Sequence, residues 1–209
     1  MSEQLLDSLQ VKPCAEPVPR RFSREEYYRM GEAGIFAPDE HVELIQGEIL
    51  YMAPQGSPHF TSICAAEETL RVAFGAGFQV RLQGPITLGP KSEPEPDIAV
   101  VSGSFRDYED DHPTSALLVV EVSESTLVYD RTIKASLYAS AHIADYWIIN
   151  LVEDLVEVYR SPQSDSAAPF GARYGQVTQH GRGDVVSPLS APQASIRVED
   201  LLPRRRGEL

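Results

Sequence analysis

The spacing of hydrophobic and polar positions in the first fifty residues predicts a short helix followed by two strands. The segment Ser23-Arg-Glu-Glu26 has the pattern of a capping box, so a helix is expected to begin after Ser23. Residues 42–52 contain two largely apolar runs, one on each side of a plausible turn at Gln46-Gly47. Glycine provides the positive φ that tight turns require, which predicts a hairpin.

A second, longer helix is expected after this hairpin. Ser57 and Pro58 are suited to its N-cap and its first position, and apolar residues recur at helical spacing until Gly75. Gly75 is expected to end it. Residues 78–88, with apolar side chains among polar ones, predict a strand.

Two short, almost entirely apolar runs follow, at residues 98–101 and 117–122. Such runs are typical of central strands that are buried on both faces. The intervening residues 102–115 are expected to form an acidic loop. Ser125 or Thr126 is expected to open a further helix.

The last third of the chain predicts mainly strands. Residues 146–150 and 155–159 are expected to form a hairpin, residues 161–176 a loop, and Val185-Val186 and Ile196–Val198 weak strands. The order of elements indicates an α/β (α+β) fold, in which helices flank a central mixed β-sheet.

Composition and charge narrow the class of protein. The chain has 209 residues, 42% of them hydrophobic, and a net charge of −13, which argues against a broad basic surface for nucleic acid. No apolar run approaches membrane length, and the first twenty residues lack the apolar core of a signal peptide. Two cysteines make no disulfide framework, so a cytoplasmic location is expected. We divide the chain into a flexible lead (1–20), one domain (21–202) and a basic tail (203–209).

The candidate chemistry lies on the two apolar strands. Asp97 precedes the first strand and Glu121 lies near the end of the second. If the strands are neighbours, the two carboxylates could share Mg²⁺ or Mn²⁺, and Lys134 could neutralise a phosphate or orient a water molecule. The alternatives are solvated or salt-bridged carboxylates and a lysine whose amine reaches solvent at the surface.

A family resemblance supports the first interpretation. The segments EPDIAVV, LLVVEVSEST, YDRTIKASLYASAHIADYWIIN and VEVY resemble the PD-(D/E)xK nuclease superfamily, and more closely its restriction-endonuclease-like Uma-two family. The resemblance covers residues 21–202. It implies a restriction-endonuclease-like core and a Mg²⁺-dependent endonuclease that hydrolyses DNA, with a homodimer as a further expectation.

The resemblance also assigns roles to individual residues. The superfamily's usual Glu-x-Lys is replaced here by Glu121-Val-Ser, and the resemblance implies that the lysine has moved to the next helix as Lys134. Asp130, four residues earlier on the same face, could orient Lys134 or simply begin the helix. Glu43 matches a family segment and could complete the acidic cluster, or be an exposed glutamate.

Two residues of the second helix are further candidates. Glu67 is a rival fourth acid, and His59 lies in the first turn, where a neutral hydrogen-bonding role is expected because the helix dipole disfavours a charged histidine.

Two other functions stay open on the sequence. The first is a non-catalytic module that keeps the nuclease fold and binds nucleic acid or a protein, which the negative charge favours. The second is hydrolysis of another phosphate ester at the same site.

Overall fold

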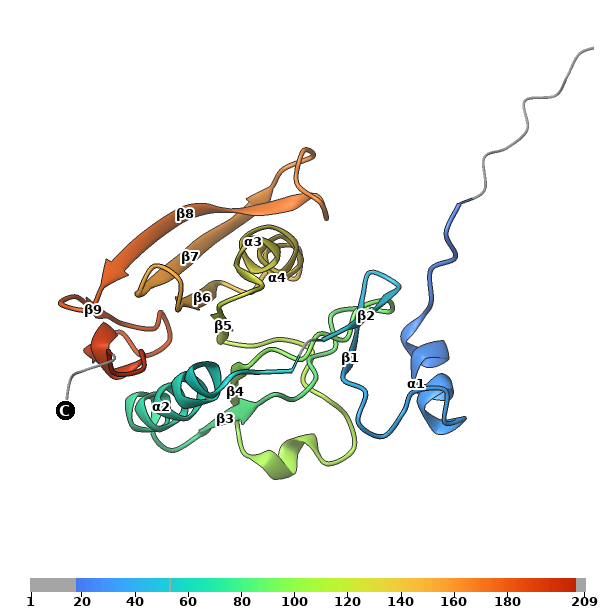
Figure 1. The fold of residues 1–209 in the computed structure, drawn as a ribbon, viewed down its shortest axis with the longest axis horizontal. Helices are drawn as coiled ribbons and strands as arrows, with labels where there is room; N and C mark the ends of the chain where they lie inside the picture. Colours follow the sequence, from blue (N-terminus) through green and yellow to red (C-terminus); the bar gives the residue numbers. More distant parts are fainter. Residues whose placement is uncertain (1–17, 53, 206–209) are drawn as a thin grey trace, which may run out of the picture.

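The main body of the protein is a six-stranded β-sheet with helices on both faces (Figure 1). The computed structural model describes residues 18–52 and 54–205. In spatial order the strands are β3 (Phe78–Leu82), β4 (Ile98–Ser102), β5 (Leu118–Ser123), β6 (Asp145–Asn150), β7 (Leu155–Ser164) and β8 (Ala172–Gly181). Within this sheet β5 and β6 run parallel and the other neighbouring pairs run antiparallel. The prediction of a central mixed sheet flanked by helices is therefore confirmed.

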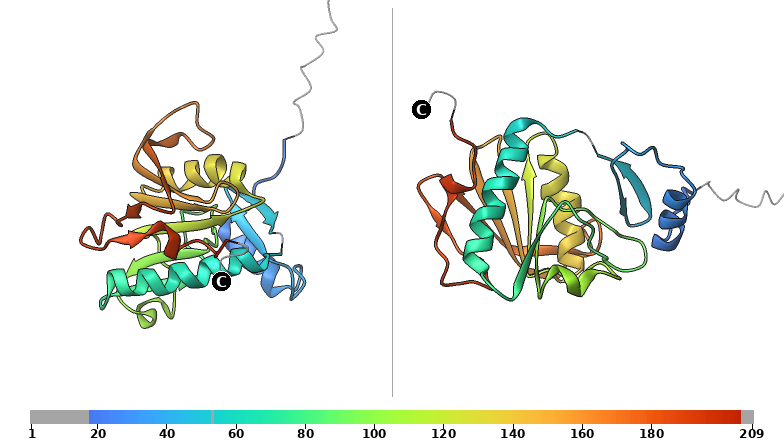
Figure 2. Two further views of the ribbon diagram at one scale, coloured as in Figure 1. Left: turned by 60° about the vertical axis from the view of Figure 1, so that its left-hand side comes forward. Right: turned by 90° about the horizontal axis from the view of Figure 1, so that it is seen from below.

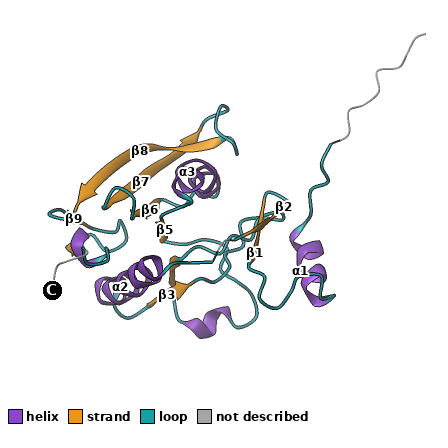
Figure 3. Cartoon of the chain, viewed as in Figure 1, coloured by secondary structure: helices purple, strands orange, loops and turns teal. Residues whose placement is uncertain are grey.

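The parallel pair requires a crossover connection, and a helical segment provides it. It consists of α3 (Leu127–Tyr129), a π-helical turn (Asp130–Lys134) and α4 (Ala135–Ser140), which follow one another without a break. Figure 3 shows this segment beside the sheet, next to β7 and β8. The crossover helix therefore leaves the end of β5 and packs back against the sheet.

Apolar side chains of the central strands alternate between two cores, one on each face of the sheet. Helix α2 (Ser57–Phe74) covers one face, together with the C-terminal pieces β9 (Val185–Val186), β10 (Ile196–Arg197) and the 3-10 turn Val198–Asp200. The crossover helix covers the other face. Figure 2 shows α2 and the crossover helix on opposite sides of the sheet.

A hairpin and the first helix lie at one end of this body (Figure 1). The hairpin consists of β1 (Val42–Ile45) and β2 (Glu48–Tyr51), and α1 (Arg24–Glu32) precedes it. The buried Glu93 attaches both: its N–H donates to the carbonyl of Leu44 at 2.7 Å, and its carboxylate accepts from Tyr28 at 2.8 Å. The hairpin therefore docks beside the loop that leads into β4.

Several local predictions are confirmed in detail. Ser23 caps α1 and forms both bonds of a capping box with Glu26. The turn of the first hairpin has positive φ at Gln46 and Gly47, and Gly75 ends α2 with a φ of 69°. The weak strand signals at residues 185–186 and 196–197 correspond to the antiparallel pair β9 and β10.

Three local predictions are wrong. Gly56 is the N-cap of α2 and Ser57 is already helical. The strand expected at 78–88 ends at Leu82, because Gln83 takes a positive φ.

The expected loop at 161–176 contains the end of β7 and the start of β8. Beyond Arg160, β7 has no partner on its β6 side, so Pro162 removes no hydrogen bond from that ladder.

Most of the predicted lead and tail falls outside the described residues, which include only 18–20 of the lead and 203–205 of the tail. In the described part of the chain, no helix combines the length and the apolar character needed to cross a membrane.

The two sides of α2 provide a direct test of this packing. Leu70 is 1% exposed in the core, whereas Val72 is 82% exposed. We expect Leu70→Ala to lower the free energy of unfolding by about 2–5 kcal/mol, because it leaves a cavity. Val72→Ala, the control on the same helix, should change it by about 0.5 kcal/mol or less. Urea unfolding measures both, and equal losses would contradict this placement of α2.

Candidate functional site

Asp97 and Glu121 lie side by side because β4 and β5 are antiparallel neighbours, with Ile98 opposite Val120. The backbone N–H of Asp97 donates to Glu121 Oε2 at 3.2 Å. The N–H of Val122 donates to Asp97 Oδ2 at 2.8 Å. Both carboxylates are buried. Each acid is therefore held by the backbone next to the other one, which fixes their relative position.

The alternation of β5 aims Glu121 at the crossover helix. Val119, Glu121 and Ser123 share one face of the strand, and Val119 belongs to the core under that helix. Tyr138 of α4 donates from its hydroxyl to Glu121 Oε1 at 2.7 Å. The amine of Lys134 lies 3.3 Å from the same oxygen. Glu121 therefore contacts the crossover helix at two points.

Lys134 is buried, with only 1% of its surface exposed. Its Nζ lies 2.7 Å from Glu43 Oε2, so the ammonium group pairs with two carboxylates from different elements. Glu43 is 3% exposed and comes from β1 of the docked hairpin. The alternatives of a solvent-seeking lysine and an exposed Glu43 are therefore wrong. Burial lowers the pKa of Lys134, but Glu121 and Glu43 outweigh that effect and raise it, so the amine stays protonated.

A π-helical turn begins at Asp130 and ends at Lys134. The N–H of Ala135 donates to the carbonyl of Asp130, five residues back, and the hydroxyl of Tyr146 donates to the same carbonyl at 3.1 Å. The charge of Asp130 helps to raise the pKa of Lys134, but the carboxylates that contact the amine are those of Glu43 and Glu121. The orienting role of Asp130 stays a prediction.

The Asp130 side chain turns to the end of β5 instead. Its Oδ2 accepts from Ser123 at 2.7 Å and from Thr126 at 2.6 Å. Asp130 therefore ties the start of the π turn to β5.

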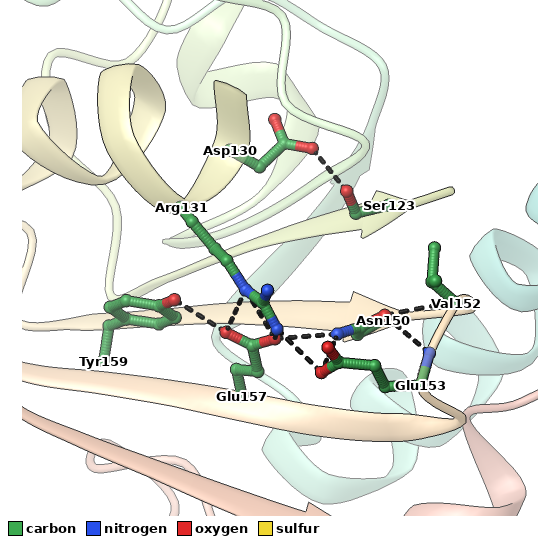
Figure 4. Close-up of polar contacts among 8 residues, drawn as sticks. All are labelled: Ser123, Asp130, Arg131, Asn150, Val152, Glu153, Glu157 and Tyr159. Carbon is green, nitrogen blue, oxygen red and sulfur yellow. Dashed lines mark hydrogen bonds and ion pairs between the residues drawn. The ribbon is translucent and has the colours of Figure 1, made fainter. Parts of the chain in front are cut away.

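A second attachment holds the same turn to β7. The guanidinium of Arg131 donates to both carboxylate oxygens of Glu157, at 3.0 and 3.1 Å from Nε (Figure 4). Asn150 and Tyr159 also donate to this carboxylate. Glu157 is 1% exposed. Burial raises its pKa, but hydrogen bonds from Arg131, Tyr159 and Asn150 lower it more, so the carboxylate stays ionised. Asp130 and Arg131 thus fix the segment that presents Lys134.

The beginning of α2 closes the site on the side of Asp97. His59 Nε2 lies 3.3 Å from Asp97 Oδ2, and Gln55 donates to Asp97 Oδ1 at 3.4 Å. Burial lowers the pKa of His59, but its contacts with Asp97 and with the backbone of Val122 outweigh burial and raise it. A carboxylate in direct contact therefore opposes the dipole of the helix at His59, and the neutral hydrogen-bonding role stays a prediction.

Glu67 lies elsewhere on the same helix. Its carboxylate pairs with Arg71 at 2.8 Å, one turn further along α2, and it is not brought to the acids of the site.

Negative charge exceeds positive charge in this cluster. Burial raises the pKa of Glu121 to about 8, and the charges of Asp97, Asp130 and Glu43 add to that rise while Lys134 opposes it. The pKa of Glu95 is raised by burial and then by Glu43. Burial also raises the pKa of Asp130. Such a site favours binding of a proton or a cation.

The oxygen donors fit a hard divalent cation. Among residues 18–52 and 54–205, no group of three or more His, Cys, Asp or Glu side chains is arranged to hold a metal ion by itself. Mg²⁺ does not require such a cage, because it is commonly held by one or two carboxylates together with water and substrate oxygens. Asp97 and Glu121 are two such carboxylates.

Sequence reasoning missed three neighbours of these acids. Tyr138 follows Lys134 by four residues, a spacing that places both on one helix face and could have shown that both face Glu121. Glu95 stands two residues before Asp97 in the same motif. Gln55 lies in the loop before α2, and no sequence pattern around it indicates a contact with the site.

Comparisons with known proteins agree with this architecture. The model of the Uma2 family, which is the Uma-two family named above and is described as "Putative restriction endonuclease", matches residues 24–199. No curated protein matches the chain. A crystal structure described as "a putative nuclease belonging to DUF820" from Anabaena variabilis is similar, with a TM-score of 0.58 and 17% identity over 77% of this chain and 88% of the other. This similarity concerns the fold.

The ion pair between Arg131 and Glu157 can be tested by measuring the free energy of unfolding of variants. Arg131→Met should lower the free energy of unfolding by about 3–5 kcal/mol, because it leaves the Glu157 charge buried without its cation. The double variant Arg131→Met/Glu157→Gln should recover most of that loss, since no uncompensated charge remains. Denaturant unfolding of the three proteins measures this. A double variant as unstable as the single one would contradict the argument.

The raised pKa of Glu121 predicts a pH effect. Burial raises the pKa of Glu121 to about 8 in the cation-free folded protein, whereas the unfolded chain releases this proton near the usual value of 4.5. Folding therefore binds a proton, and this contribution to stability is complete below the unfolded pKa and is lost as pH rises through the folded one.

We expect Glu121→Gln to reduce the fall in Tm between about pH 5 and about pH 8, measured with a chelator present. Glu67→Gln, which alters a surface ion pair, should keep the wild-type dependence. The same pH dependence in Glu121→Gln and wild type would refute the assignment.

Proposed function

Because this chain belongs to the Uma2 family, we propose that it is an endonuclease that uses a divalent cation to hydrolyse phosphodiester bonds in DNA. The observation that carries the proposal is the convergence of Asp97, Glu121 and Lys134 from three separate elements in one buried cluster. Two carboxylates and an ammonium group at such distances suit a negatively charged substrate only when a cation is also present.

We assign the cation to Asp97 and Glu121, with Mg²⁺ as the expected ion and Mn²⁺ as a substitute. When bound, it supplies a Lewis acid that stabilises charge on the phosphate. The chain itself holds the two carboxylates in place through the crossed bonds from the N–H groups of Asp97 and Val122. The excess negative charge of the cluster favours cation binding, because the cation relieves repulsion among buried carboxylates.

Lys134 acts as a fixed positive charge in this proposal. Its pKa is raised, so it donates hydrogen bonds and does not accept a proton. Directed at a phosphate oxygen or at the attacking water, it would stabilise the negative charge that develops during hydrolysis. Glu43 and Glu121 orient the ammonium group. The π turn, attached through Asp130 and Arg131, sets the direction from which it enters.

DNA is the substrate that the family description favours. With a net charge of −13, the protein is expected to bind DNA weakly until a cation is present. A chain with one such site would need a second copy to cut both strands together, which is the basis for expecting a homodimer. Action on cellular DNA would place the protein in the cytoplasm.

A nuclease assay on plasmid DNA with Mg²⁺ or Mn²⁺ tests the proposal. Glu121→Gln and Lys134→Gln should each lower the cleavage rate by about 10²–10³-fold, because each removes a charge that stabilises the transition state. Glu121→Gln keeps an oxygen for Tyr138 and is expected to fold. Val72→Ala, on the exposed side of α2, is the control and should cleave as wild type.

Cleavage that is equal in all four proteins would refute the assignment, since the activity would then come from elsewhere. Calorimetry distinguishes the proposed endonuclease from the alternative of a non-catalytic module. Wild type should bind Mn²⁺ at millimolar concentration and Glu121→Gln should bind it more weakly. Absence of binding and of cleavage in wild type would favour the module.

A further inference from the structure

Tyr129 lies beside the proposed site, and the proposed hydrolysis assigns it no role. It is the last residue of α3 and immediately precedes the π turn that carries Asp130 and Lys134. Its side chain is half-buried, and its hydroxyl oxygen is buried without a hydrogen-bond partner among the described residues. A buried polar group in this state costs free energy, which raises the question of what the hydroxyl binds.

The other buried tyrosines of the same core make the contrast clear. Their hydroxyls all have partners: Tyr138 donates to Glu121, Tyr146 to the Asp130 carbonyl, Tyr159 to Glu157 and Tyr174 to the Ile143 carbonyl. The fold therefore satisfies its structural tyrosines. Tyr129 differs from them in that its hydroxyl has no such partner among the described residues.

The surroundings of Tyr129 are those of the site. The charges of Lys134, Glu43, Asp130 and Glu121 all act on its phenol. Burial raises its pKa, so at physiological pH the hydroxyl is a neutral donor and carries no negative charge that would repel an anion.

The carboxylate oxygens around it have other donors. Glu43 pairs with Lys134, Glu121 accepts from Tyr138, and Asp130 accepts from Ser123 and Thr126. No hydrogen bond of the described residues joins the tyrosine O–H to these carboxylates, and Glu43 Oε2 has the Lys134 ion pair but no hydrogen bond of its own.

We propose that Tyr129 is a substrate-binding residue whose hydroxyl donates a hydrogen bond to a non-bridging oxygen of the phosphodiester. This inference rests on the proposed function, because it places the substrate phosphate at the Lys134 side of the cluster. A phosphate oxygen supplies the acceptor that the fold does not provide. The bond is charge-assisted, so it is stronger than a bond between neutral groups.

Tyr129→Phe tests the proposal, because stability and function should change in opposite directions. Removal of an unsatisfied hydroxyl should keep or raise the Tm of the cation-free protein, by up to about 2–4 °C. The same change should weaken binding of a fluorescent DNA duplex in Ca²⁺, and lower the cleavage rate in Mg²⁺, by about tenfold or more.

Tyr174→Phe is the matched control. It removes a hydroxyl that has a partner, 2.8 Å away, and that lies outside the site, so it should lower Tm and leave duplex binding and cleavage as in wild type.

The outcomes separate the two proposals. If wild type cleaves DNA and Tyr129→Phe binds and cleaves equally well, the role of Tyr129 is refuted while the proposed function stands. A loss of Tm like that of Tyr174→Phe also refutes it, because the hydroxyl would then have a structural partner. A wild type that neither cleaves nor binds the duplex refutes the proposed function, and the role of Tyr129 with it.

Discussion

A buried ammonium group must be paired with negative charge, and this requirement at Lys134 determines much of the architecture. Its partners Glu43 and Glu121 come from the docked hairpin and from the central strand β5. The interaction therefore joins three parts of the chain. The hairpin therefore contributes more than backbone contacts. It supplies Glu43, which is one of the two carboxylates that balance the charge of the lysine.

The same requirement explains why the surrounding helix is attached so firmly. A lysine has a long and flexible side chain, and it can present its charge in one direction only if its backbone is fixed. The bonds of Asp130 to β5 and of Arg131 to β7 supply that rigidity on two sides. The carboxylates are fixed differently, through backbone N–H groups of neighbouring strands. The site thus combines the ends of two central strands with a helix that is held to the sheet by polar side chains.

Much of this arrangement follows from local sequence patterns. The apolar runs around Ala99 and Val119 identify the central strands, and the alternation along β5 places Glu121 on the face of the crossover helix. The prediction that the strands bearing Asp97 and Glu121 are neighbours is confirmed by their pairing. The catalytic roles of these residues stay predictions.

Other features could not be predicted, because they depend on contacts between distant parts of the chain. The pairing of Glu43 with Lys134 depends on how the hairpin docks, through Glu93. The bond between Arg131 and Glu157 depends on the register of β7. The π turn inserts a single residue into the helix, and the three residues of α3 before it are too few to reveal the shift in hydrophobic spacing. That single residue also matters for how such chains can diverge. A deletion within 130–133 would restore regular α-helical winding and still span the crossover, yet it would rotate Lys134 and α4 together by about 100° relative to α3. Relatives could then keep the fold and the motif letters while losing the geometry of the site, so alignments that ignore this one-residue offset would misjudge which of them retain it.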